Sequence, residues 1–142
     1  MSLMKSLRLP MAVILGLVLG IAGTIGLSAQ QVGQHVGGSG HVLIRTDLTG
    51  EPGKEVYMSL FEPPSGARFG PHTHPGDELS FLLDGTVRID VAGAEPKVLH
   101  PGDTFYVERD KVHGGQVISD TPAKILSVHV VDKGKPLIIP VK

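Results

Sequence analysis

The stretch that decides the fold runs from Gly66 to Gly85 and reads GARFGPHTHPGDELSFLLDG. His72 and His74 are two residues apart on a segment expected to be extended, so both imidazoles point to the same face. Pro75-Gly76 predicts a turn, after which Glu78 returns toward the same point from the next strand. Two imidazoles and a carboxylate at one point are ligands for a borderline transition metal. This stretch therefore predicts two strands that meet either at a metal site or, as the alternative, at a pair of solvent-exposed histidines.

The sequence on both sides of this stretch has the pattern of short strands. Runs rich in Val, Ile, Leu and Phe are separated by Gly, Pro and Asp, and no helical apolar stripe of useful length is present. Asp84-Gly85 is a strong hairpin signal because glycine adopts positive φ without strain. The pattern predicts an all-β sandwich or barrel. The expected strands cover residues 42–46, 55–61, 68–69 leading into 72–74, 78–83, 86–91, 97–99, 104–107, 112–118, 124–131 and 137–140.

The start of the chain has the composition of a secretory signal. Lys5 and Arg8 precede an apolar run at residues 11–27, and the small residues Ser28 and Ala29 follow it. We expect residues 1–29 to be a signal peptide, cleaved near Ala29, and the protein to be exported to the periplasm or secreted. The alternative is an uncleaved membrane anchor through residues 9–27, whose length is at the lower limit for crossing a bilayer.

The remainder of the chain is the length of one domain. The chain has 142 residues, and glycine-rich residues 30–40 are expected to form a flexible tether before a domain at 41–142. The absence of cysteine excludes disulfide scaffolds and thiolate metal sites. A formal net charge of -1 gives no basic surplus to neutralise phosphates, so nucleic acid is not an expected partner.

Two segments together resemble the paired motifs of the cupin superfamily. Residues 66–85 match G-x5-H-x-H-x3-E-x6-G, and Gly102 and His113 match the ends of the second motif, G-x5-P-x-G-x2-H. The chain departs from that second motif at Glu108 and Asp110, which stand where the motif has Pro and Gly. The resemblance covers residues 41–142 and is greatest to small single-domain cupins of the quercetin-dioxygenase-like type.

The resemblance implies a small jelly-roll-like β-barrel that holds one divalent transition metal, drawn from Mn, Zn, Cu, Ni or Fe. The implied metal ligands are His72, His74, Glu78 and His113, with His113 approaching from a strand across the barrel. Without the motif's Pro and Gly, we expect the charged turn at residues 109–111 to hold His113 less rigidly. The family likeness also allows a homodimer and implies a small-molecule ligand.

His129 is a further candidate, for a catalytic role. It shares a face with Ser127 on a late strand, so it is either a proton acceptor beside the metal or a hydrogen-bonded histidine of the barrel. We favour a metal-dependent enzyme that acts on a small oxygenated molecule by dioxygenase-like or Lewis-acid isomerase or hydrolase chemistry. The alternative is a non-catalytic module that binds or senses a small molecule or a metal. Because Fe(II) oxidises readily outside the cell, export favours Mn, Zn, Cu or Ni.

Overall fold

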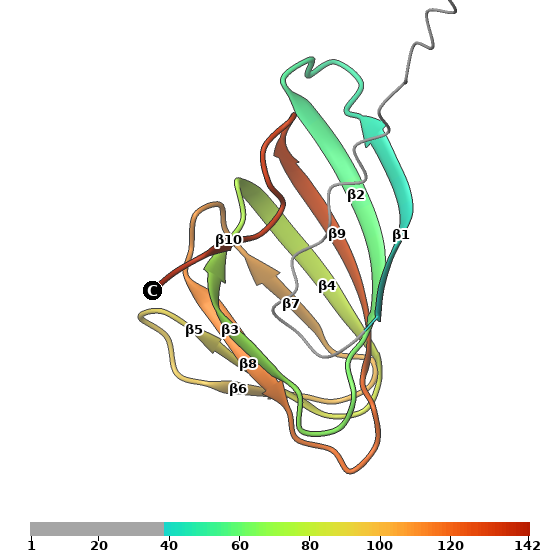
Figure 1. Ribbon diagram of the computed structural model, residues 1–142, viewed down its shortest axis with the longest axis vertical. Coiled ribbons are helices and arrows are strands. Elements are labelled where there is room, and N and C mark those ends of the chain that lie inside the picture. Colours follow the sequence, from blue (N-terminus) through green and yellow to red (C-terminus); the bar gives the residue numbers. More distant parts are fainter. Residues whose placement is uncertain (1–38) are drawn as a thin grey trace, which may run out of the picture.

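The computed structural model describes residues 39–142, which form ten strands in two sheets (Figure 1). No helix of this part of the chain is long and apolar enough to cross a membrane. The all-β prediction is confirmed, and each expected strand is present with bounds that shift by a few residues. The strands are β1 (Ser39–Asp47), β2 (Lys54–Glu62), β3 (Arg68–Thr73), β4 (Gly76–Asp84), β5 (Val87–Val91), β6 (Lys97–Leu99), β7 (Thr104–Val107), β8 (His113–Val117), β9 (Lys124–Asp132) and β10 (Ile139–Pro140).

The predictions about the N-terminal part of the chain concern residues that the structure does not describe. The expected signal segment at 1–29, its alternative as an anchor at 9–27, and residues 30–38 of the expected tether lie outside the described residues. Ser39 and Gly40, the last two residues of that tether, are the first two residues of β1.

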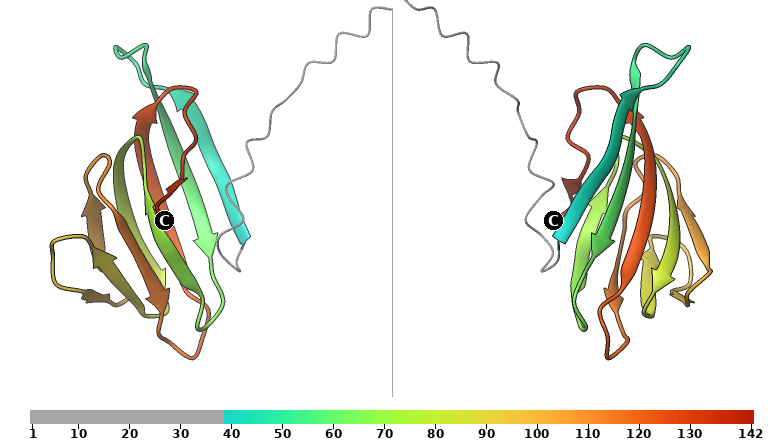
Figure 2. Two further views of the ribbon diagram at one scale, coloured as in Figure 1. Left: turned by 60° about the vertical axis from the view of Figure 1, so that its left-hand side comes forward. Right: turned by 90° about the vertical axis from the view of Figure 1, so that its right-hand side faces the viewer.

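Each sheet has five antiparallel strands. One sheet has the order β1-β2-β9-β4-β7, and the other has the order β10-β3-β8-β5-β6. The two sheets lie as two layers of a jelly roll (Figures 1 and 2). Strands distant in sequence become neighbours in this arrangement: Glu78 on β4 is opposite His129 on β9, and His72 on β3 is opposite His113 on β8. The topology therefore brings all five candidate residues to the space between the sheets.

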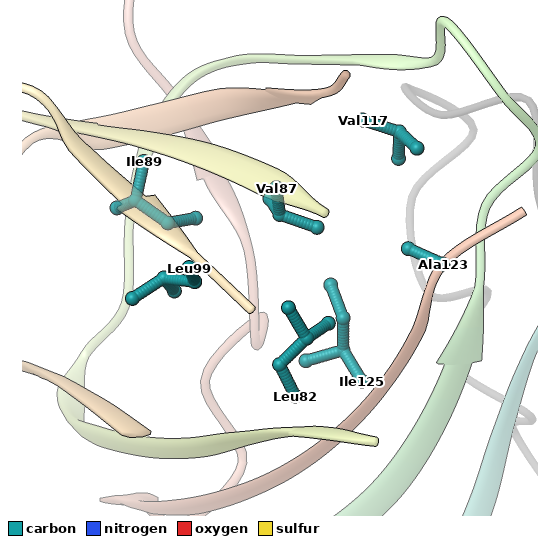
Figure 3. Packing of buried hydrophobic residues seen from close by; sticks show 7 residues of the cluster. All are labelled: Leu82, Val87, Ile89, Leu99, Val117, Ala123 and Ile125. Atoms are coloured by element: carbon teal, nitrogen blue, oxygen red, sulfur yellow. The ribbon is translucent and has the colours of Figure 1, made fainter. Parts of the chain in front are cut away.

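The interior between the sheets is apolar at one end and polar at the other. Along β4 the inward side chains are Glu78, Ser80 and Leu82, and along β9 they are Ile125, Ser127 and His129. This alternation follows from the two-residue repeat of a strand. The apolar end is a core cluster of Leu82, Val87, Ile89, Leu99, Val117, Ala123 and Ile125 (Figure 3). The core fixes the strands at one end and leaves the other end of the interior for the polar site.

Two glycines permit close approaches that position β4. Gly85 has φ of 81°, as the hairpin signal predicts, and a Cβ on it would lie 2.8 Å from Ala123 Cα. Gly76 was expected in a turn, but it is the first residue of β4. A Cβ on Gly76 would lie 2.0 Å from the carbonyl oxygen of Val130, so only glycine lets β4 approach β9 at this point. The chain bends at Pro75 instead, directly after His74.

Candidate metal centre

The four predicted ligands and His129 converge on one point between the sheets. Glu78 Oε2 lies 3.0 Å from His74 Nε2, 3.1 Å from His113 Nε2 and 3.8 Å from His129 Nε2. The His72 ring joins the group with its centroid 4.2 Å from that of His113. Side-chain nitrogens of His72, His74 and His113 lie within 4.8 Å of one another, and so do the donor atoms of His74, Glu78 and His129. Each of these two sets of donor atoms is close enough together to hold a metal ion.

Backbone carbonyls fix the orientation of three of the imidazoles. Nδ1–H of His72 donates to the carbonyl of Gly70 at 2.8 Å, and that of His113 donates to Lys111 at 3.0 Å. Nδ1–H of His74 donates to the carbonyl of Leu137 at 2.6 Å, from a segment 63 residues away in sequence. A hydrogen bond at Nδ1 leaves the Nε2 lone pair free for a metal, which is the usual arrangement of ligating histidines.

The carboxylate of Glu78 is held in a similar way. Its Oε1 accepts a hydrogen bond from Ser80 Oγ at 2.7 Å, and Ser80 Oγ in turn lies 2.6 Å from Ser127 Oγ. Oε2 is left to face the imidazoles. With Nδ1 protonated, Nε2 of His74 and His113 would present lone pairs to a carboxylate oxygen about 3 Å away. A cation, either a proton or a metal ion, must lie between them. The donor set therefore fits a divalent metal.

The protonation states of the cluster suit metal binding. Burial alone would raise the pKa of Glu78, but hydrogen bonds from His113 and His74 lower it well below its ordinary value. Burial lowers the pKa of His72 to about 4. Burial acts in the same direction on His113, but its hydrogen bonds to Glu78 and Lys111 raise its pKa. The carboxylate is thus ionised and His72 is neutral at pH 7, and a metal ion at His113 would compete with a proton for its Nε2.

His129 differs from the other three histidines. It is 5% exposed, and burial lowers its pKa to about 4, so the ring is neutral. Its Nδ1 is buried and has no hydrogen-bond partner among residues 39–142. The alternative expected from the sequence was a histidine whose ring nitrogens are hydrogen-bonded within the barrel, and Nδ1 of His129 does not fit it. His129 is therefore a neutral imidazole whose Nε2 faces the carboxylate of Glu78 and whose other nitrogen is unsatisfied.

The loop before His113 is charged and exposed, as expected, but it is also firmly anchored. Asp110, which stands where the motif has Gly, has φ of 58° and is the one non-glycine with positive φ in the described part of the chain. Its N–H donates to the carbonyl of His74 at 3.0 Å. Arg109 donates through its backbone N–H to Asp77 Oδ1 at 3.0 Å and through its guanidinium to Asp132. These contacts argue against the expectation that His113 is loosely held, because they join its loop to β4 and β9.

A cavity of about 180 Å³ lies beside the cluster, and its other walls are largely apolar. No sequence pattern pointed to a role for His41 or for the half-buried pair Leu137 and Ile138, which line the cavity from β1 and from the segment before β10. Three of the lining residues (Gly40, His41 and Val42) are exposed, so the cavity opens to solvent near β1. The apolar wall consists of Phe61, Phe69, Ile89, Phe105 and Ile125.

Solved structures share this architecture. A cupin superfamily protein from Desulfitobacterium hafniense DCB-2 is 23% identical with a TM-score of 0.56, over 70% of this chain and 80% of that chain. DMSP lyase DddQ from Ruegeria pomeroyi DSS-3 is 23% identical with a TM-score of 0.60, over 73% and 51% of the two chains. A structure of oxalate oxidase is 21% identical with a TM-score of 0.57, over 74% and 55%. At this level of identity the similarity shows the fold.

Sequence comparisons point to the same family. Nitrosourea synthase from Streptomyces achromogenes subsp. streptozoticus is 32% identical over 57 residues, which are 40% of this chain and 12% of that protein. The match thus spans about an eighth of the curated relative. The family model described as Cupin domain matches residues 59–129, half of the chain, and includes every residue of the cluster. The chain belongs to the cupin superfamily.

Proposed function

We propose that this protein is an exported metalloenzyme that acts on a small oxygenated organic molecule. The observation that carries the proposal is that His74 and His113, both oriented by backbone carbonyls, lie against Glu78 Oε2, with the carbonyl-oriented ring of His72 beside them. His72, His74, Glu78 and His113 would hold one divalent transition metal. A set of three nitrogens and one oxygen suits Mn, Zn, Cu, Ni or Fe, and export favours the first four.

The metal would supply Lewis-acid polarisation of a substrate oxygen or, if it is redox-active, access to dioxygen chemistry. Four protein ligands leave one or two positions open for an ion that takes five or six. This arrangement is typical of catalytic rather than structural sites. The cavity on the open side supports the same reading, since a substrate needs space beside the ion.

His129 is the side chain that we propose for proton transfer. Its neutral ring is 3.8 Å from Glu78 Oε2, and it lines the same cavity as the proposed ligands. An imidazole without a proton at one nitrogen accepts a proton from a bound hydroxyl group. The apolar side chains that line the cavity lower its local polarity, which strengthens hydrogen bonds made inside it.

A second candidate function is a non-catalytic module that binds or senses a small molecule. The observation in its favour is the scarcity of ionisable groups in the cavity: beside the four proposed ligands, only His41 and His129 line it within residues 39–142. One of these, His41, is exposed near the opening. A binding protein needs no proton-transfer group, so turnover decides between the two functions.

The test begins with the full chain expressed in an exporting host. Mass spectrometry of the exported protein is expected to show a chain that begins near Gln30, and a retained residue 1 would contradict cleavage. Metal analysis is expected to give one equivalent of a divalent metal. Oxygen uptake and product formation are then measured with catechols, enediols and 1,3-diketones. Turnover that is lost in His74→Ala supports the enzyme, whereas tight binding without product supports the binding module.

A further inference from the structure

The wall of the cavity concentrates the aromatic side chains of this protein. The sequence has four phenylalanines, and three of them, Phe61, Phe69 and Phe105, line the cavity from β2, β3 and β7. The fourth, Phe81, is 38% exposed on the opposite face of β4. Three phenylalanines from separate strands therefore line the same cavity as the proposed metal ligands.

This wall is held in place from behind. All three cavity phenylalanines pack against the core cluster that contains Ile89 and Ile125. Phe61 and Phe69 also pack on each other, with ring centroids 5.6 Å apart and planes tilted by 60°. Tilted rings at this separation attract one another beyond their buried area. Since interiors are close-packed, the rings cannot retreat without disturbing the core.

The volume in front of the wall is small. The cavity measures about 180 Å³. An apolar cavity of about 150 Å³ accommodates benzene. The space inside the cavity thus takes one ring together with its polar substituents, and a further ring would have to extend through the opening near β1 or displace the wall. His74, Glu78 and His113 line the cavity at the polar end of the interior, and the three phenylalanines that line it pack against the core cluster at the apolar end.

We propose that Phe61, Phe69 and Phe105 are specificity-determining residues that limit the ligand beside the metal to a single ring. The ligand class is a monocyclic compound with two neighbouring oxygens, whose oxygens face the metal and whose ring packs on the phenylalanines. The requirement for two neighbouring oxygens rests on the proposed function, because these oxygens would bind the proposed metal. The limit to a single ring rests on the phenylalanines that line the cavity and on its volume. A ligand whose chelating ring carries further rings on both sides is excluded.

The test compares two probes on protein loaded with Zn²⁺, which is redox-inactive and so separates binding from turnover. Catechol has one ring, whereas the chelating ring of 3-hydroxyflavone carries a fused ring on one side and a phenyl group on the other. Isothermal titration is expected to show catechol binding at least about ten-fold more tightly, since a clash in a packed site costs about 1.4 kcal/mol or more. Equal affinities for the two probes in the native protein would overturn the proposal.

Variants of single phenylalanines test which side chain limits the size of the ligand. Phe105→Ala is expected to reduce the preference for catechol by about ten-fold, because 3-hydroxyflavone gains the space. Phe105→Leu, a smaller change, is expected to show a partial effect if the alanine variant does not fold. Phe81→Ala removes the same side chain from the outer face and is the matched control, with the native preference expected. A preference unchanged in both folded Phe105 variants would contradict the assignment.

A metal-independent probe separates the two proposals. Toluene added to metal-free protein is expected to shift the methyl resonances of Ile89 and Ile125, which line the cavity. If Zn²⁺ fails to bind but toluene shifts these resonances, the proposed metalloenzyme is wrong and the aromatic wall stands. If Zn²⁺ binds but toluene leaves the resonances unchanged, the wall is not a ring site and the inference fails.

Discussion

Arg109 and Asp132 are joined by two parallel hydrogen bonds, 2.6 Å from Nη2 to Oδ1 and 2.9 Å from Nη1 to Oδ2. The pair ties the loop before His113 to the end of β9, where Lys54 also bonds Asp132 at 2.7 Å. Because Lys111 of this loop supplies the carbonyl that orients His113, the pair restrains from the surface the loop that orients one of the proposed metal ligands. It restrains a loop that lacks the Pro and Gly of the family motif.

Arg109→Gln is therefore expected to weaken metal binding more than it weakens the fold. The pair is exposed, so its loss changes stability little. Loss of a group that orients a ligand lowers metal affinity by about ten-fold or more, and Arg109 acts one step further away, so we expect roughly ten-fold at most. Chelator competition measures the affinity. The native protein should also lose affinity with added salt, because screening weakens exposed pairs.

Lys124→Gln is the matched control for Arg109→Gln. Lys124 forms an ion pair with Glu62 at 2.9 Å and is similarly exposed, but it lies at the other end of β9 from the cluster. Its loss is expected to leave metal affinity unchanged. Equal effects of the two variants would mean that net charge, and not the position of the loop, determines the affinity.

Removing single histidines should rank their roles. His72→Ala or His74→Ala is expected to abolish metal retention while the barrel still folds, because the core lies at the other end of the interior. His113→Ala is expected to weaken binding without abolishing it. His129→Ala should retain the metal and lose turnover. Metal analysis and circular dichroism check these outcomes, and global unfolding of both the His72 and His74 variants would make the metal structural.

Asp110→Gly should stabilise the protein. Asp110 has φ of 58°, a conformation that costs most L-residues about 1–2 kcal/mol and glycine nothing. Aspartate tolerates this region better than most residues, and glycine adds backbone freedom to the unfolded chain, so the expected gain is about 0.5 kcal/mol. Denaturant unfolding measures it. Asp120→Gly, at an exposed position without positive φ, should lower stability or leave it unchanged.

Glu55 should contribute to the loss of stability in acid. It is buried at 3% exposure, accepts hydrogen bonds from Arg45 Nε at 2.8 Å and from the N–H of Gly134 at 3.0 Å, and lies 3.3 Å from Tyr57 Oη. Burial alone would raise its pKa, but these hydrogen bonds lower the pKa below its ordinary value of 4.5. The unfolded chain then takes up its proton first, so the stabilisation is complete above about pH 4.5 and is lost as the pH falls through the folded pKa.

Glu55→Gln tests this contribution. The variant should be less stable than the native protein at pH 7, and its free energy of unfolding should fall less steeply below pH 4.5. Glu51→Gln is the control, because Glu51 is exposed and has no ion pair within the described residues. If the free energy of unfolding of Glu55→Gln falls below pH 4.5 as steeply as that of the native protein, other carboxylates account for the whole loss of stability in acid.

Most of the secondary structure could be predicted because strand signals are local. The alternation of buried and exposed residues in β9 and the Asp84-Gly85 hairpin require only neighbouring residues to be read. The role of Gly76 could not be predicted in this way. Its close approach to Val130 depends on the pairing of β4 with β9, which are some fifty residues apart.

The sequence by itself determined the strands and the family, because strand periodicity and motif spacing are local features of the chain, and its resemblance to the cupin motifs singled out His72, His74, Glu78 and His113. Only the tertiary structure decided how these groups are oriented and what lies beside them. The carbonyl of Leu137, the restraint from Arg109 and the phenylalanine wall come from segments that meet through sheet pairing and packing. Periodicity along the chain carries no record of such long-range contacts, because it specifies the face of a residue and not its partner.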